Sequence, residues 1–160
     1  MISFENNGHR FHFRAGGLAL VEDHILLHRL EGDDFWALPG GRVEMGEEAT
    51  HTIEREFNEE LGIAVRCGEL LSVGENFFSY RGEPHHEVGM YFSVQLPEES
   101  SLLKLDVTHF GVEGNQRLEF KWFHRAALSE VDFRPVAVRK MLAPGAILQR
   151  HFVQRANNVA

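Results

Sequence analysis

The sequence contains one cysteine, five prolines and no long apolar segment. A lone cysteine, Cys67, excludes an internal disulfide and a zinc site built from thiolates, and it fits best as a small apolar strand residue. The longest run of apolar residues and glycine, 15–21, is much shorter than the roughly 20 residues of a membrane-spanning helix. The first residues show no cationic segment followed by an apolar one, so we expect no secretory signal. These absences predict a cytoplasmic protein that does not span a membrane.

Negative charge is concentrated in one short segment. The 24 acidic and 16 basic side chains give a net charge of −8. Residues 44–60 hold seven glutamates and one cation, Arg55, and so contribute −6 of that total. Like charges crowded on a short segment repel, so such a cluster normally holds a cation. The basic residues are scattered and form no stripe, which argues against non-specific binding to duplex nucleic acid.

The remaining pattern predicts one domain over 1–160 with a mixed α/β fold, because strand-like segments outnumber helical ones and no repeat or linker interrupts them. Proline and glycine at 38–41 mark an irregular loop. Helices are expected at 49–61, ended by Gly62, and at 135–142. Strands are expected as a hairpin of 11–21 and 24–30, at 64–80 with a bend near Gly74, at 87–96, at 117–124 and after 147, whereas 97–116 carries no clear pattern.

The predicted helix over 49–61 carries its acidic and apolar residues on adjacent faces. At about 100° per residue, Glu56, Glu59 and Glu60 share one sector of about 100°, and apolar residues from Ile53 to Leu61 lie beside it. Two such charges about 6 Å apart repel by about 3 kcal/mol at an effective dielectric constant near 20. Oxygen ligands without Cys or His favour Mg²⁺, Mn²⁺ or Ca²⁺ over zinc. The pattern therefore predicts a divalent-metal site, which suits the attack of water on a phosphate chain.

The segment from Gly41 to Ile63 resembles the signature of the Nudix hydrolase superfamily. That signature is a Gly, five residues, a Glu, seven residues, and then Arg-Glu-apolar-any-Glu-Glu-any-Gly-apolar. The sequence GGRVEMGEEATHTIEREFNEELGI matches it at every position, with the bulky Phe57 at an apolar one. The preceding Leu-Pro-Gly-Gly at 38–41 and the order of the strands extend the resemblance over most of the chain.

The resemblance implies an α/β/α sandwich around a mixed β-sheet. It also implies hydrolysis of a nucleoside diphosphate that is linked to another group. Carried over position by position, Glu56, Glu59 and Glu60 match the metal-binding glutamates of the family. The carbonyl of Gly40 matches a backbone ligand of the metal. The implied cofactor is Mg²⁺, with Mn²⁺ as a substitute.

Further roles follow from the same resemblance. Arg55 and Glu47 match the pair that orients the carboxylates of the helix. Glu56 matches the general base proposed in some members, whereas other members recruit a base from a later loop. Many relatives add a carboxylate from outside the signature. We expect Glu119 to supply it, with Glu113 as the alternative.

Four residues outside the signature are candidates for binding substrate. Arg29 precedes the 38–41 loop and could meet a phosphate, although a surface ion pair explains it equally well. Trp36 could stack on a base or belong to the core. Tyr80 follows the signature at a distance where relatives that cleave dinucleoside polyphosphates tend to carry a tyrosine. His86 could lie near the pocket.

The leading hypothesis is a Mg²⁺-dependent pyrophosphohydrolase that acts on a small nucleotide or nucleoside diphosphate derivative, as a monomer or a homodimer. One alternative is a Nudix-type module that binds a nucleotide or sugar phosphate as a sensor with weak or no catalysis. Another is a Ca²⁺-binding or merely acidic interaction protein. The sequence does not indicate which nucleotide or leaving group is used.

Overall fold

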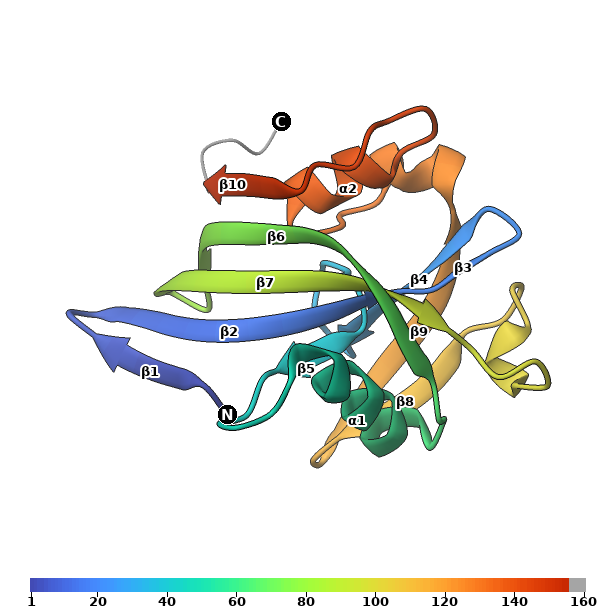
Figure 1. Cartoon of the computed structure of the whole chain (residues 1–160), viewed down its shortest axis with the longest axis horizontal. Coiled ribbons are helices and arrows are strands. Elements are labelled where there is room, and N and C mark those ends of the chain that lie inside the picture. Colours follow the sequence, from blue (N-terminus) through green and yellow to red (C-terminus); the bar gives the residue numbers. More distant parts are fainter. Residues whose placement is uncertain (156–160) are drawn as a thin grey trace.

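The computed structural model describes residues 1–155, and Figure 1 shows how their elements are arranged. These residues form ten β-strands and two α-helices, joined by two short 3₁₀ helices. The mixed α/β fold expected from the sequence is confirmed. No helix in this part of the chain is long and apolar enough to cross a membrane.

The larger sheet runs in the order β1-β2-β7-β6-β10, and β5 pairs with β2 beside this path. It is a mixed sheet, because β2 runs parallel to β7 and β10 runs parallel to β6, whereas the other pairs are antiparallel. The strands are β1 Ser3–Asn6, β2 His9–Leu18, β5 Gly40–Arg42, β6 Arg66–Tyr80, β7 Glu83–Gln95 and β10 His151–Arg155.

The smaller sheet is antiparallel and lies between the two α-helices, which occupy opposite sides of the molecule in Figure 1. Its strands are β3 Leu20–Val21, β4 His24–Leu30, β9 Gln116–His124 and β8 His109–Glu113. Side chains alternate along β4, so Leu26 packs in the core beneath helix α1 (Ala49–Leu61), whereas Leu27 packs with helix α2 (Val136–Leu142). The expected sandwich is thus present, built on two sheets rather than one.

Helix α1 has the bounds that its sequence pattern predicted. Ile53 and Phe57 are fully buried on its core side. The helix ends at Gly62, which has a φ of 68°, and the Gly62 N–H donates to the carbonyl of Asn58 at 2.9 Å. Glycine adopts this left-handed conformation without a steric cost, which explains the stop.

The predicted hairpin of 11–21 with 24–30 is wrong in its extent. Strand β2 ends at Leu18 and pairs with β7, whereas only the two-residue β3 pairs with the start of β4. The chain crosses from one sheet to the other at the buried Ala19. The apolar run predicted as one strand, 11–21, thus contains two strands that belong to different sheets. The sequence shows no break because both sheets bury apolar residues at this crossing.

The later strands also depart from the sequence pattern. The irregularities of β6 fall between Cys67 and Ser72, not at Gly74, which keeps a regular register with Gly89. Gly74 is instead the contact point of the Phe152 ring, which would overlap any Cβ there. Strand β7 begins four residues before the predicted 87, because a tight turn joins it directly to β6. Strands β1 and β8 were not predicted, since both are short and largely exposed edge strands.

Candidate active site

Two glycines bring the loop before α1 against the helix. Strand β5 pairs with β2 so that Gly40 lies opposite Gly16 and Gly41 opposite Ala15. A Cβ on Gly40 would overlap the carbonyl of Ala15, and a Cβ on Gly41 would overlap the carboxylate of Glu56. Because Gly40 and Gly41 have no side chains, the backbone at Gly40 packs on the backbone of Ala15 and the backbone at Gly41 packs on the Glu56 carboxylate. The peptide that joins the two glycines therefore lies next to the acidic face of α1.

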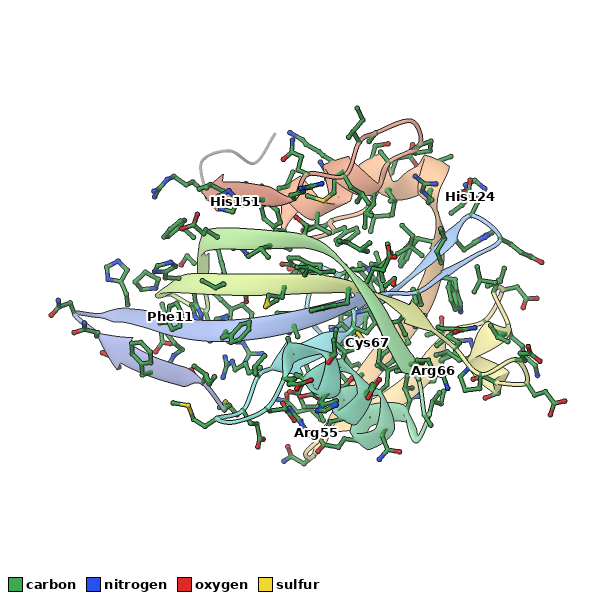
Figure 2. All side chains as sticks on the ribbon, in the orientation of Figure 1. Phe11, Arg55, Arg66, Cys67, His124 and His151 are labelled. Carbon is green, nitrogen blue, oxygen red and sulfur yellow. The ribbon has the colours of Figure 1, made fainter. Side chains whose placement is uncertain are left out.

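Arg55 organises the acidic residues around a single guanidinium. Its Nε donates to Glu47 at 2.7 Å, and its Nη1 donates to Glu56 at 3.0 Å and to Glu59 at 3.1 Å. Its Nη2 also donates to the carbonyl of Arg42 at 3.3 Å. Figure 2 shows Arg55 beside α1, where the loop and the helix meet. One cation thus holds the loop, the helix and three carboxylates in a fixed arrangement.

Glu47 is the fully neutralised member of this cluster. It accepts two hydrogen bonds from Arg55 and one from the hydroxyl of Thr52. The hydrogen bonds from Arg55 lower the pKa of Glu47 to about 2. In return, the bond to Glu47 raises the pKa of Arg55 further above its usual range. Glu47 therefore anchors Arg55 and remains charged at every pH where the protein would act.

Glu56 and Glu60 are the under-neutralised members. Burial, reinforced by the charge of Glu60, raises the pKa of Glu56 to about 7. Burial, reinforced by the charge of Glu113, raises the pKa of Glu60 to about 8. Each carboxyl therefore binds a proton more readily than usual, mainly because it is buried and secondarily because other carboxylates lie near it. A divalent cation would displace these protons and remove the repulsion.

The chemistry of the site fits a hard divalent metal. Glu56 and Glu60 present oxygen donors that are largely buried and lack a full complement of cations. Glu59 is more exposed and turned toward Arg55. Within residues 1–155, no three His, Cys, Asp or Glu side chains converge as they stand on a point that could hold a metal ion. Binding through all three glutamates would therefore require these side chains to rearrange, and both Glu56 and Glu59 are bound to Arg55.

Two polar residues beside Glu60 were not singled out from the sequence. His28 Nδ1 lies 3.7 Å from a carboxylate oxygen of Glu60. Arg14 donates to the carbonyl of Leu38 at 2.9 Å and lies 3.4 Å from His28 Nε2. Arg14 comes from β2 and His28 from β4, so the two sheets meet at this point. Nothing in the local sequence distinguishes these residues from other strand residues, and only the tertiary fold brings them together.

Glu119, Arg29 and Trp36 lie together, away from the cluster. Arg29 donates to Glu119 at 2.6 Å and its guanidinium lies 4.3 Å from the centre of the Trp36 ring. Neighbouring strand residues point to opposite faces, so Arg29 faces away from the side on which His28 meets Glu60. Trp36 is buried in the core on the α2 side. The structure thus groups these three candidates with one another and not with the glutamates of α1.

The charge of Glu113 acts on the acidic cluster, whereas that of Glu119 does not. The Glu113 charge contributes to the raised pKa of Glu60, and the exposed Glu113 lies at the end of β8. Gly111 of the same strand packs against the carbonyl of Glu60, where a Cβ would lie 2.6 Å from that oxygen. The β8–β9 hairpin therefore brings Glu113 to the side of the site that Glu60 occupies.

Tyr80 and His86 have defined places of their own. The Tyr80 hydroxyl donates to Asp33 at 3.3 Å, which joins the β6–β7 turn to the loop after β4. His86 stacks on Phe77 with ring centres 4.5 Å apart. His86 lies on the face of β7 opposite to Glu87, which binds His12 at 2.6 Å. Neither Tyr80 nor His86 contacts the glutamates of α1 in the described residues.

Cys67 fits its expected role as a strand residue. It lies at the start of β6, as Figure 2 shows, and it packs beside the core on the α1 side. Burial raises the pKa of its thiol to about 11. The thiol therefore stays protonated and unreactive near neutral pH.

The fold and the site define a mixed α/β protein in which one helix carries a cluster of glutamates that the neighbouring arginine neutralises only in part. The model of the NUDIX domain matches residues 10–143, which is most of the chain. The chain therefore belongs to the NUDIX domain family, which confirms the resemblance of its 41–63 segment.

The relatives of this chain carry several different names. An RNA pyrophosphohydrolase of Ruthia magnifica subsp. Calyptogena magnifica is 24% identical over 146 residues, which cover 81% of this chain and 79% of that protein. An 8-oxo-dGTP diphosphatase of Haemophilus influenzae is 44% identical over 48 residues, which cover 28% of this chain and 35% of that protein. The chain spans only 31–50% of the length of the first curated relatives that it matches.

Solved structures agree with the fold. A NUDIX hydrolase from Nitrosomonas europaea matches with a TM-score of 0.61 and 21% identity over 90% of this chain and 78% of that chain. A MutT NUDIX hydrolase from Burkholderia pseudomallei matches with a TM-score of 0.53 and 25% identity over 72% of this chain and 84% of that chain. The architecture described above is therefore that of NUDIX hydrolase structures.

Proposed function

We propose that this protein is a Mg²⁺-dependent pyrophosphohydrolase that cleaves a nucleoside diphosphate derivative by attack of water on phosphorus. The proposal depends on two largely buried carboxyls, Glu56 and Glu60. Their raised pKa values indicate that too little positive charge lies near them to stabilise the ionised form. A pair of acids in this state beside a fixed arginine suits a metal that also binds phosphate oxygens. Membership in the NUDIX family supports the same reaction.

We assign metal binding and carboxylate positioning to different residues of the site. Glu56, Glu59, Glu60 and the carbonyl of Gly40 would hold the metal, with Mn²⁺ as a substitute for Mg²⁺. When bound, the metal neutralises phosphate charge and lowers the pKa of water. Arg55, anchored by Glu47, would keep the carboxylates oriented while Glu59 exchanges its bond to Arg55 for the metal.

The proton of the attacking water needs an acceptor. Glu56 is our candidate for this base, because its carboxylate lies largely buried within the cluster that would hold the metal and the attacking water. A carboxylate from outside the helix would complete the site. Glu113 is better supported in that position than Glu119, because the charge of Glu113 acts on Glu60 whereas Glu119 is paired with Arg29.

Substrate contacts would come from residues at the margin of the site. Tyr80 is our leading candidate, because its ring is partly exposed at the turn that faces the loop after β4. Arg29 is paired with Glu119, Trp36 is buried in the core and His86 is stacked on Phe77. Each of the four residues, Tyr80 included, would have to give up a present contact to bind substrate. The substrate class is a small nucleotide derivative rather than duplex nucleic acid, which fits the net charge of −8.

The test is a screen of nucleoside diphosphate derivatives, dinucleoside polyphosphates and 5′-triphosphorylated RNA with Mg²⁺ and with Mn²⁺. Released phosphate would be measured after phosphatase treatment, in parallel for wild type and Glu59→Gln. We expect turnover of at least one compound by wild type, its loss in excess EDTA, and its collapse in the variant. Full turnover by the variant or in EDTA would contradict the proposal.

The same screen separates the enzyme from a sensor module. A sensor would be stabilised against heat by a ligand that mass spectrometry recovers unchanged. The observation that favours this second candidate is the pairing of Glu59 with Arg55, which leaves the glutamates short of convergence. We further propose that the protein acts in the cytoplasm as a monomer or homodimer, which light scattering of the purified chain would distinguish.

A further inference from the structure

Three elements meet at the carboxylate of Glu60. Glu60 comes from α1, His28 from β4 and Arg14 from β2, and all three side chains are largely or partly buried. The ring of His28 lies between the other two. Its Nε2 faces Arg14 Nη2 at 3.4 Å, and its Nδ1 faces a carboxylate oxygen of Glu60 at 3.7 Å.

The contact with Arg14 fixes the tautomer of His28. A guanidinium has only donors, so the Nε2 of His28 that faces it must be an unprotonated acceptor. The neutral ring then carries its single proton on Nδ1, the atom that faces Glu60. Burial also lowers the pKa of His28, in agreement with the neutral ring that the contact with Arg14 requires.

The Nδ1 atom is left without a partner in the described residues. It is buried and makes no hydrogen bond, although it faces a carboxylate. A contraction of about 0.7 Å would bring the pair into hydrogen-bonding range. A buried donor without an acceptor is energetically costly, and an oxygen of Glu60 is the acceptor that Nδ1 faces.

We propose that Arg14 and His28 form a positioning relay that holds Glu60 in its metal-binding orientation. This inference rests on the proposed function, because it assigns the relay to the same site. Arg14 sets the ring tautomer, and the Nδ1–H of His28 then donates to a carboxylate oxygen of Glu60. The other oxygen of Glu60 would then be the one that binds the cation. Neither relay residue belongs to the 41–63 segment.

The first test reads the tautomer directly in the unmodified chain. Histidine-labelled protein would be studied by long-range ¹⁵N–¹H correlation at pH 7, with the His28 ring assigned through bonds to its backbone. We expect a protonated Nδ1 and an unprotonated Nε2. A proton on Nε2, or a doubly protonated ring, would overturn the relay without the need for any variant to fold.

The second test measures Mg²⁺ and Mn²⁺ binding by calorimetry, with no substrate present. His28→Gln keeps a polar atom toward Arg14 but has none near the Nδ1 position, whereas His28→Asn places an amide N–H there. We expect a loss of affinity of about 10-fold or more in His28→Gln, as for other residues that orient metal ligands, and at most about 3-fold in His28→Asn. His24→Gln is the matched control, because His24 is a half-buried histidine at the start of the same strand whose ring contacts His124 rather than Glu60.

Turnover adds a second readout. We expect His28→Gln to need about 10-fold more Mg²⁺ for half-maximal rate while kcat at saturating Mg²⁺ stays within about 3-fold of wild type. Unchanged metal affinity in a folded His28→Gln would overturn the relay alone. Equal losses in the Gln and Asn variants would also overturn it, because a purely structural role does not distinguish them. Wild-type protein that neither binds Mg²⁺ nor turns over a substrate would overturn the proposed function itself.

Discussion

The two faces of the smaller sheet differ in how far the charge of their carboxylates is neutralised. On the α2 side, Glu119 is matched one-to-one by Arg29, which stacks on Trp36. On the α1 side, Arg55 is shared among several glutamates, and the pKa values of two of them rise to about 7 and about 8. Charge is balanced in the first arrangement, whereas in the second the acids outnumber the one arginine that bonds to them, and we propose that a metal ion supplies the missing positive charge. An excess of buried acid over base, rather than the number of acids, therefore distinguishes the side on which we propose the reaction to occur.

The largest effect should come from Glu56→Gln, which removes both a metal-binding carboxylate and the proposed base. We expect kcat/KM to fall by at least about 100-fold, in line with the loss of a general base. The fold should be retained, because the substitution also removes a repulsive charge from beside Glu60. Steady-state kinetics and circular dichroism would test both statements, and a variant with wild-type kcat/KM would contradict the account.

The close packing of the loop against α1 offers the next test. A methyl group on Gly41 would overlap the Glu56 carboxylate and displace it. We expect Gly41→Ala to weaken Mg²⁺ binding by about 10–100-fold, the range found when metal ligands lose their support. Gly32→Ala is a control, because no atom lies within 4 Å of the Cβ that it adds. Gly32 has a φ of 99°, so its variant carries backbone strain without touching the site.

The pH dependence of stability should separate the two faces as well. The pKa values of Glu56 and Glu60 lie above the ordinary 4.5, so their contribution to stability is complete below pH 4.5 and is lost as the pH rises through 7 and 8. The lowered pKa of His28 acts in the opposite direction, but that effect is complete above pH 6.5. Between pH 6.5 and 8.5, the stability contributed by Glu56 and Glu60 therefore decreases, and His28 adds no compensating gain.

We therefore expect the Tm of the metal-free protein to fall by at least about 3 °C from pH 6.5 to 8.5, which corresponds to roughly 1 kcal/mol for a chain of this size. Saturating Mg²⁺ should reverse this fall, since it replaces the protons of Glu56 and Glu60. Scanning calorimetry with EDTA or Mg²⁺ would measure it. A Tm that rises with pH in EDTA would be inconsistent with under-neutralised glutamates.

The smallest effect is expected on the opposite face. Glu119→Gln removes the charge that pairs with Arg29, so we expect a loss of about 1 kcal/mol in the free energy of unfolding and less than about 3-fold in kcat/KM. Urea titration and the same kinetic assay would measure the two quantities. If Glu119→Gln abolished activity as Glu56→Gln does, Glu119 would be a ligand after all and the contrast between the faces would fail.

The sequence predicted the parts of the molecule that depend on local pattern. Helix α1 and its stop at Gly62 follow from apolar periodicity and from a glycine that accepts a left-handed φ. Alternation along β4 also predicts that His28 and Arg29 point to opposite faces. It cannot tell which of the two faces meets α1, because that depends on how the sheets pack. Glu119 was therefore expected at the site, and His28 was overlooked.

Strand boundaries were predicted less well for a related reason. The start of β7 carries Pro84, which weakens a strand pattern, yet the residue fits because it pairs at the end of the β6–β7 hairpin. The crossing at Ala19 is invisible locally, since an apolar run reads the same whether one sheet or two bury it. Arg14 acquires its contact with His28 only through this crossing.

The most direct test of the central claim is a crystal structure with Mg²⁺ and a non-hydrolysable nucleoside diphosphate analogue. We expect carboxylate oxygens of Glu56 and Glu60 at about 2.0–2.1 Å from Mg²⁺, Glu59 released from Arg55, and phosphate oxygens on the same ion. Glu119 should keep its bond to Arg29. An ion bound elsewhere, or carboxylates of Glu56 and Glu60 that contact only protein atoms, would contradict the account.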